Sequence, residues 1–385
     1  MNIIPQAGYD IVMLTSAHGA TDDRIFYREA KSLLEAGFSV SVVGRHPVSE
    51  MVEGIAIHAV PSTGSRMKRL FLGGTILKLA LRLKGRLYIF HDPELFGIGL
   101  LLTFLGKPVV YDSHENLPKV LLQKEWLPWP IRILLFPLVS VAEFLGSRLL
   151  SGVIAAVPTI QKRFAGRHTV LVRNFPTRAA LHVLGEGPEI CSRANVAIYT
   201  GGLSRIRGIG ELVQAFSGIQ GAQLWLVGKF DDPKFEREIL ASLPDNVTWF
   251  GWKSFPDVLK MYRSAKLGMV LLYPEPNHRN SLPVKLFEYL GAGLPVVASD
   301  FPEFAEYVDG CGLQVDPHNV EKIRIAVQTL LSDDDTLSRM SLRARERAVR
   351  EFSWEPEAAR LIEFCKNRVI PRKVAAPQLA SRRSS

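Results

Sequence analysis

The chain has 385 residues, of which 47% are hydrophobic and 22% are charged, and it contains no low-complexity tract. This composition indicates a globular protein long enough for two domains, each with its own core. Lys and Arg outnumber Asp and Glu by 47 to 38, and the net charge of +9 favours an anionic partner: a phosphorylated substrate, an anionic lipid or nucleic acid. The three cysteines lie far apart and form no CxxC pair, which argues against a disulfide framework and a zinc site.

Two apolar runs, residues 95–105 and 131–150, are too short or too interrupted by charges and proline to cross a membrane, so we expect buried core helices there. Trp126 and Trp129, beside prolines and cations, also suit shallow insertion at a membrane surface. The first ten residues lack the features of a signal peptide. We therefore expect a cytoplasmic protein that can associate with anionic lipid on the inner face of the cell membrane. Nucleic acid is disfavoured, because no binding module accompanies the basic clusters.

The first half of the chain opens with the pattern of a Rossmann-like domain. Residues 10–15 are predicted to form a buried strand, followed by a polar loop, a helix over 24–35 and a second strand over 38–44. The loop lacks G-x-G-x-x-G, which disfavours a nicotinamide or flavin enzyme. It instead places His18, Asp22 and Asp23 at the carboxyl end of the first strand, where open α/β sheets bind ligands.

Polar side chains also follow two later strands of this domain. The run LYIFHDPE places His91, Asp92 and Glu94 after one strand, and PVVYDSHE places Asp112, His114 and Glu115 after another. A lone histidine in such a place is more often structural. Two histidines at matching strand ends favour a functional site.

A second Rossmann-like unit begins at NVAIYTGGLSRIRGIGEL, which reads as strand, glycine loop and helix. Gly201 and Gly202 allow the backbone to approach a ligand closely. Arg205 and Arg207 precede the helix, and paired arginines at a helix N-terminus suit a diphosphate. The next strand ends at Lys229.

The stretch 280–300, NSLPVKLFEYLGAGLPVVASD, predicts a helix of about ten residues and a buried parallel strand. Ser281 is the expected N-cap, and Pro283 is expected in the first turn. Lys285 and Glu288 lie one turn apart on one face. A cation, free amides and a carboxylate suit a ligand with phosphate and hydroxyl groups, such as a nucleotide sugar; a surface helix with an ordinary Lys–Glu pair is the alternative.

Five motifs in this order resemble the GT-B fold retaining glycosyltransferases of family 4, also called glycosyl transferases group 1. They are HDPEL at His91–Leu95, VYDSHE at Val110–Glu115, YTGGLSRIRGIGEL at Tyr199–Leu212, PVKLFEYLGAGLPVVASD at Pro283–Asp300 and FSWE at Phe352–Glu355. The resemblance covers residues 10–365. It implies an α/β protein with two Rossmann-like domains facing each other across a cleft, over 1–175 and 195–352. We further expect a linker over 176–194, a helix over 353–370 that crosses back to the first domain, and a disordered basic tail over 371–385.

The resemblance further implies a nucleotide-diphosphate sugar as donor, a saccharide or lipid-linked acceptor, and neither metal nor cofactor. It implies catalytic roles for His114, Arg207 and Glu288, with Glu288 on the nucleotide ribose. The implied donor-binding residues are Gly201, Gly202, Arg205, Arg207, Lys229, Asn280, Ser281, Leu282, Pro283, Val284, Lys285 and Glu288. His18, Asp22, Asp23 and His91 are implied on the acceptor side.

The chain departs from the family pattern at three places. Asn280 stands where the family often has a second glutamate, Gly202 stands where a basic residue is frequent, and the family's Arg-Lys-Gly appears as Ile206-Arg207-Gly208. We expect a transferase that acts with retention of configuration in cell-surface polysaccharide biosynthesis. Two alternatives stay open: a non-hydrolysing sugar-nucleotide epimerase, which shares the fold, and a non-catalytic sugar- or lipid-binding homologue.

Overall fold

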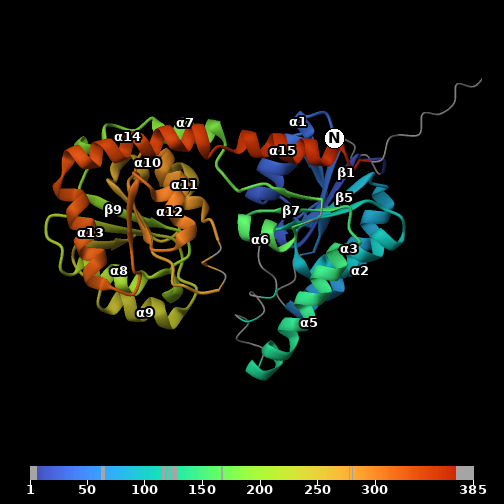
Figure 1. The fold of residues 1–385 in the computed structure, drawn as a ribbon, viewed down its shortest axis with the longest axis horizontal. Helices are drawn as coiled ribbons and strands as arrows, with labels where there is room; N and C mark the ends of the chain where they lie inside the picture. Colours follow the sequence, from blue (N-terminus) through green and yellow to red (C-terminus); the bar gives the residue numbers. More distant parts are fainter. Residues whose placement is uncertain are drawn as a thin grey trace, which may run out of the picture.

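The computed structural model describes residues 7–61, 66–114, 118, 122, 128–165, 168–276, 278–279 and 281–369, with the backbone alone for 66–71. Asn280, Glu115, Trp126 and the predicted tail lie outside the described residues. The chain forms two α/β domains, each built on its own sheet, as predicted (Figure 1).

The first domain holds an eight-stranded sheet in the order β3-β4-β2-β1-β5-β6-β7-β8. All neighbouring strands are parallel except β3 and β4. The order reverses between β1 and β5, so the loops after these strands part at a topological switch point, where such sheets bind ligands. The strands are β1 (Ile11–Gly19), β2 (Val40–Arg45), β3 (Glu50–Val52), β4 (Ile55–Val60), β5 (Leu87–Phe90), β6 (Val109–Ser113), β7 (Gly152–Ala155) and β8 (Thr169–Leu171).

Helices cover both faces of this sheet, and two apolar cores lie between sheet and helices. The helix predicted over 24–35 is present but begins as a π-helix, which Asp22 caps by accepting hydrogen bonds from the backbone N–H groups of Arg24 and Ile25. The helical elements are η1 (Asp23–Ala30), α1 (Lys31–Glu35), α2 (Arg66–Leu83), η2 (Pro93–Leu95), α3 (Phe96–Phe104), α5 (Trp129–Ser147) and α6 (Pro158–Arg163).

The prediction of a buried core helix over 131–150 is wrong. Helix α5 extends away from the sheet (Figure 1), and Trp129, Leu134 and Leu138 are each more than half exposed. Phe104, at the end of α3, is also exposed. In the part of the chain that the structure describes, α5 is the one helix whose length and composition would allow it to cross a membrane, and 17% of its apolar window is buried. An apolar run records hydrophobicity, but it does not record whether another element packs on it.

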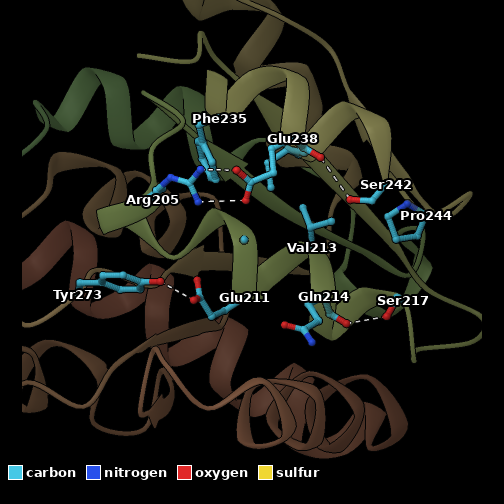
Figure 2. A pocket seen from close by; sticks show the side chains of 12 residues that line it. Arg205, Glu211, Val213, Gln214, Ser217, Phe235, Glu238, Ser242, Pro244 and Tyr273 are labelled. Carbon is cyan, nitrogen blue, oxygen red and sulfur yellow. Dashed lines mark hydrogen bonds and ion pairs between the residues drawn. The ribbon is translucent and has the colours of Figure 1, made fainter. Parts of the chain in front are cut away.

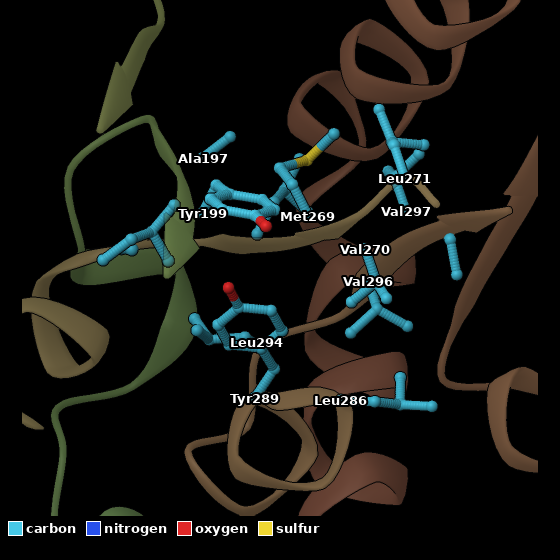
Figure 3. Close-up of a cluster of buried hydrophobic side chains, with 14 of the residues drawn as sticks. Ala197, Tyr199, Met269, Val270, Leu271, Leu286, Tyr289, Leu294, Val296 and Val297 are labelled. Atoms are coloured by element: carbon cyan, nitrogen blue, oxygen red, sulfur yellow. The ribbon is translucent and has the colours of Figure 1, made fainter. Parts of the chain in front are cut away.

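The second domain holds a six-stranded parallel sheet in the order β11-β10-β9-β12-β13-β14. One continuous core surrounds it, and Figure 3 shows part of this core, with Tyr199 and Tyr289 among aliphatic side chains. The strands are β9 (Val196–Thr200), β10 (Gln223–Val227), β11 (Val247–Trp249), β12 (Leu267–Val270), β13 (Val296–Ser299) and β14 (Gly312–Val315). The helical elements are α7 (Arg178–Gly185), η3 (Ile190–Ser192), η4 (Arg205–Arg207), α8 (Ile209–Phe216), α9 (Pro233–Ala241), α10 (Phe255–Ser264), α11 (Val284–Gly291), α12 (Pro302–Val308), α13 (Val320–Ser332) and α14 (Asp334–Glu351).

Two segments connect the domains. The segment expected as a linker contains α7, whose Leu181 and Leu184 lie in the second core. The last helix, α15 (Trp354–Lys366), follows α14 and lies on the first domain (Figure 1). There Trp354 Nε1 donates to Ser32 Oγ at 2.8 Å, and Leu361 joins the first domain's core. The chain therefore returns to the domain where it began.

A buried carboxylate holds α15 to the strand-exit segment of the first domain, and its removal tests this attachment. Glu357 accepts hydrogen bonds from Arg173 N and Nε at 3.0 and 3.2 Å and pairs with Arg360 at 2.6 Å. Glu357→Gln keeps the shape but removes the charge, and we expect it to lower the free energy of unfolding by about 2 kcal/mol in urea titrations. Glu363→Gln, an exposed position on the same helix, is the matched control; equal unfolding midpoints for the two variants would contradict this role.

Candidate functional site

A pocket of about 500 Å³ lies between the two domains. Asp23 and Arg28 line it from η1 in the first domain, and Phe255 and Glu288 line it from the second, with Thr177 from the connecting segment. One predicted acceptor-side residue, Asp23, and one predicted donor-side residue, Glu288, therefore line the same cleft.

The loop after β9 carries glycine where it passes very close to the end of β10. Gly201 has φ +119° and Gly228 has φ +145°, and a Cβ atom on Gly228 would collide with the carbonyl oxygen of Gly201. A side chain is therefore excluded from Gly228 on steric grounds as well as by its dihedral angle. On the other face of Gly201, a Cβ atom would lie 3.0 Å from Lys285 Nζ and 3.6 Å from Arg207 Nη1. The loop thus presents bare backbone beside two cations.

Lys285 is a cation without an anionic partner. Its Nζ is buried, lies 3.7 Å from the centroid of the Tyr199 ring and has no hydrogen-bond partner among the described residues. Burial lowers the pKa of Lys285. Burial would raise the pKa of Tyr199, but the charges of Lys285 and Arg207 outweigh it and lower that pKa. A buried ammonium without a hydrogen-bond partner favours the approach of an anion.

Helix α11 begins later than predicted. Pro283 is its N-cap, no side chain caps its first turn, and the helix has eight residues. The Ser281 hydroxyl instead donates to the carbonyl oxygen of His278 at 3.0 Å, so it is used in the preceding turn. Uncapped N–H groups of a first turn and the helix dipole both favour an anion, and Lys285 lies in that turn. Leu282, Pro283 and Val284 are half-buried around it.

Glu288 rests on a network of buried hydroxyl groups. Tyr262 OH donates to Glu288 Oε2 at 3.1 Å, and Tyr262 OH lies 2.7 Å from Thr200 Oγ1. Tyr289 OH accepts from Thr200 N at 2.9 Å. Burial raises the pKa of Glu288. These tyrosines fix the carboxylate from β9, α10 and α11, and the sequence carries no motif that would have indicated them.

The structure does not bring Arg205 to this site. Its guanidinium pairs with Glu238 on α9, with Nη1 3.0 Å from Oε1, and lies over the Phe235 ring (Figure 2). It lines a separate surface pocket together with Glu211 and Tyr273. Arg205 and Arg207 are two residues apart in one 3-10 turn, and side chains at that spacing do not share a face. The predicted arginine pair is therefore replaced by Arg207 and Lys285, while Lys229 is exposed at the end of β10.

In the first domain, the last residues of β1 wrap around the buried carboxylate of Asp92. Asp92 Oδ2 accepts from Ser16 N at 2.6 Å, Ala17 N at 2.9 Å and Thr15 Oγ1 at 2.7 Å. Asp92 Oδ1 lies 2.7 Å from His18 Nδ1. Burial would raise the pKa of Asp92, but the hydrogen bond and charge of His18 and the loop donors outweigh it and hold the pKa below its ordinary value.

A second buried carboxylate, Asp112, organises the end of β6. It accepts from Arg24 Nε and Nη2 at 3.0 and 2.8 Å and lies 2.9 Å from His91 Nδ1. His91, predicted on the acceptor side, is completely buried against Asp112. Burial lowers its pKa, which keeps the ring neutral behind Asp112. His114 is partly exposed, with Nδ1 3.5 Å from Asp112 and its ring 5.3 Å from that of His18.

The two remaining acceptor-side residues have different surroundings. Asp22 caps η1, so its carboxylate is used within the loop. Asp23 is exposed and pairs with Arg28 at 2.8 Å. Arg28 is buried, donates to Asn174 Oδ1, and lines the cleft together with Glu288. Sequence reasoning missed Arg28, although its position one helical turn after Arg24 places both on the face that follows the polar loop.

Among the described residues, two groups of ligand atoms lie close enough for one metal ion: His18–Asp92–His114 and His91–Asp112–His114. In each group, the carboxylate lies within hydrogen-bond distance of a histidine Nδ1. This chemistry fits proton donors and acceptors better than a metal site.

Because the Lys285 ammonium is unpaired, we expect its removal to stabilise the protein. Lys285→Met removes a buried charge but keeps the aliphatic stem, and we expect it to raise the free energy of unfolding by about 1 kcal/mol while weakening binding of nucleoside diphosphates. The unfolded chain binds the proton of the Lys285 ammonium more tightly than the folded protein does. The gain in the free energy of unfolding should therefore shrink as the pH rises towards the ordinary lysine pKa. Urea titrations at several pH values measure this, with Lys260→Met, at an exposed position, as the control. A loss of stability in Lys285→Met would show that the ammonium has a partner.

Comparisons with known proteins agree with this architecture. Residues 194–333 match the family model described as glycosyl transferases group 1. O-antigen chain mannosyltransferase B of Escherichia coli is 28% identical over 127 residues, which are 31% of this chain and 32% of that protein. The match thus spans about a third of the relative's length.

Solved structures match nearly the whole chain. Sucrose-phosphate synthase from Thermosynechococcus elongatus has a TM-score of 0.73 and 20% identity over 93% of this chain and 98% of that one. Anabaena HepE in complex with UDP and glucose has a TM-score of 0.71 and 16% identity over 94% and 100%. WaaG, a glycosyltransferase involved in lipopolysaccharide biosynthesis, has a TM-score of 0.67 and 14% identity over 94% and 100%. The chain therefore has the GT-B fold, and residues 194–333 of its second domain match the glycosyl transferases group 1 model.

Proposed function

We propose that the protein transfers a sugar from a nucleotide-diphosphate sugar to a saccharide or lipid-linked acceptor. The observation that carries this proposal is the unpaired ammonium of Lys285, with Arg207, beside the bare glycine loop and one turn from Glu288. A diphosphate satisfies the cations, and the hydroxyls of a ribose can donate to the carboxylate. The solved relative in complex with UDP and glucose supports this class of donor.

The same arrangement suits the chemistry of the transfer. As the bond between the sugar and the β-phosphate breaks, negative charge builds on the leaving diphosphate. Lys285, Arg207 and the first turn of α11 are fixed before the reaction, so they stabilise that charge without reorganisation. These groups supply what a divalent cation supplies elsewhere, and we propose a reaction that needs no metal and no cofactor. Closure of the two domains around the cleft would exclude water.

The finer assignments rest on the family resemblance and on the relatives. Retention of configuration follows from the resemblance to family 4. A role in cell-surface polysaccharide assembly is supported by the names of two relatives, an O-antigen mannosyltransferase and a lipopolysaccharide enzyme. We therefore propose a mannosyl or other hexosyl donor and a cytoplasmic enzyme.

The proposal is tested by transfer assays with GDP-mannose and UDP-glucose as donors and octyl α-mannoside and octyl α-glucoside as acceptors. Glu288→Gln and Arg207→Met should each lower kcat/KM at least 100-fold, because each removes a group fixed against the donor. Arg205→Met should keep wild-type activity, since that side chain faces α9. Equal losses in the Arg205 and Arg207 variants would contradict the site.

Two further arms of the assay separate the rival functions. Donor alone distinguishes an epimerase, which would convert the sugar nucleotide without an acceptor. Added EDTA tests the proposed independence from metal, since a metal-dependent transferase would lose its activity. Nucleotide binding without any turnover would favour a non-catalytic homologue.

We also propose that α5 and the end of α3 contact an anionic membrane surface. Phe104, Trp129, Leu134 and Leu138 expose apolar surface on these helices. The exposed Arg148, with its guanidinium 4.2 Å from the Phe144 ring, lies just beyond the end of α5. An exposed apolar helix with a neighbouring cation, on a chain of net charge +9, fits an anionic bilayer better than another protein surface.

Flotation with phosphatidylglycerol-containing vesicles measures this contact. The double variant Leu134→Glu/Leu138→Glu should lose at least 10-fold in membrane binding, because each charge opposes apolar insertion and is repelled by the lipid. Leu342→Glu, at an exposed position on α14 in the second domain, is the control. No flotation of the wild-type protein at low salt would reject the proposal, and a dimer that the double variant disrupts would assign α5 to self-association instead.

A further inference from the structure

We infer that the base of the nucleotide donor is guanine, and that Asp23, Tyr27 and Lys31 of the first domain recognise it. This assignment rests on the proposed function, which places the ribose of the donor on Glu288, and it adds the identity of the base to that site. The three residues line the pocket between the domains together with Glu288.

The pocket beside Glu288 has room for a base. Its volume of about 500 Å³ lies in the range of small-ligand sites, and residues of both domains line it. A nucleotide base is joined to its ribose by a single bond. When the ribose hydroxyls bind Glu288, the attached base therefore lies against the other residues of this pocket.

Two exposed aromatic rings line the pocket, one from each domain. The side chain of Tyr27 in η1 is 46% exposed, and that of Phe255 at the start of α10 is 48% exposed. The buried Phe26 ring packs edge-on at 5.1 Å from the Tyr27 ring and restricts its movement. Exposed aromatic rings are surfaces on which bases stack, and a purine offers a larger face for stacking than a pyrimidine.

Charged groups flank the Tyr27 ring along its helix. Asp23, Tyr27 and Lys31 follow one another at intervals of four residues in η1 and α1, so they lie on one side of the helix. Lys31 Nζ lies 6.0 Å from the centroid of the Tyr27 ring. A base stacked on Tyr27 therefore has a carboxylate one turn before it and an ammonium one turn after it.

Guanine is the base whose edges match this order of groups. Its N1–H and its 2-amino group are adjacent donors, which a carboxylate such as Asp23 can accept together. Its O6 and N7 are adjacent acceptors, to which a lysine such as Lys31 can donate. Adenine has an amino group in place of O6, and uracil has neither N7 nor the second donor. Neither of these bases satisfies both charged groups.

Both charged groups keep hydrogen-bonding capacity for a base. The Asp23 side chain is 66% exposed and pairs with Arg28 at 2.8 Å, but a carboxylate has about four acceptor sites. Lys31 donates to Glu53 Oε2 at 2.5 Å, and an ammonium carries further N–H donors. The base can therefore bind without loss of either ion pair. The family resemblance implied Asp23 on the acceptor side, and the present assignment moves it to the donor.

Calorimetric titration of the whole chain with GDP, IDP, ADP and UDP tests the base. The wild-type protein should bind GDP at least 10-fold more tightly than ADP or UDP. It should also bind GDP about 10-fold more tightly than IDP, which lacks the 2-amino group alone. Asp23→Ala should abolish the difference between GDP and IDP, and Asp335→Ala, in the exposed first turn of α14, is the matched control that should keep it.

Substitutions of Tyr27 test the stacking. Tyr27→Ala should weaken GDP binding about 10-fold and leave the binding of pyrophosphate unchanged, because pyrophosphate contains no base. Tyr27→Phe keeps the ring and should bind GDP as the wild type does. Since pyrophosphate binding requires the folded protein, its retention excludes misfolding as the cause of the loss.

The outcomes separate the assignment of the base from the proposed function. A wild-type protein that binds UDP or ADP as tightly as GDP would overturn the guanine assignment and leave the proposed function in place. Unchanged GDP affinity in Tyr27→Ala would do the same, since the pocket would then hold another part of the substrates. A protein that binds none of the four nucleotides would overturn the proposed function itself.

Discussion

The second domain is organised around the unpaired ammonium of Lys285 at the start of α11. The ammonium of Lys285 lies 3.7 Å from the centroid of the Tyr199 ring and beside the bare backbone of Gly201, and it has no hydrogen-bond partner among the described residues. The close approach of Gly201 and Gly228 keeps that backbone free of side chains, and the buried tyrosines beneath hold Glu288 in place. A folded protein that keeps a cation in this state is less stable than it could be, and it is prepared for an anion.

In the first domain, buried carboxylates organise the ends of the strands. Asp92 and Asp112, at the ends of neighbouring strands, each collect several donors and each lie beside a histidine. The two carboxylates do different work. Asp112 is enclosed by Arg24 and His91, whereas Asp92 accepts hydrogen bonds from the end of β1 and lies 2.7 Å from His18 Nδ1.

The domains are held as a pair by segments that belong to both. Helix α7 packs in the second core, and α15 returns to the first through Trp354 and Glu357. Arg28 and Glu288 line the cleft from opposite domains, so a ligand on Glu288 also changes the surroundings of a first-domain residue. This placement provides a direct physical route by which donor binding could favour closure.

The sequence by itself determined the elements of local origin: the alternation of strand and helix, the two Rossmann-like units, the glycine loop and the position of Glu288 one turn after Lys285. These follow from hydrophobic periodicity and from the backbone freedom of glycine, which act over a few residues. Only the tertiary structure decided which side chains share a space. It turned Arg205 towards α9, buried His91 behind Asp112, left α5 exposed, and brought Tyr262 and Arg28 to Glu288. The direction of a side chain and the covering of an apolar face depend on elements distant in sequence, and no local pattern records them.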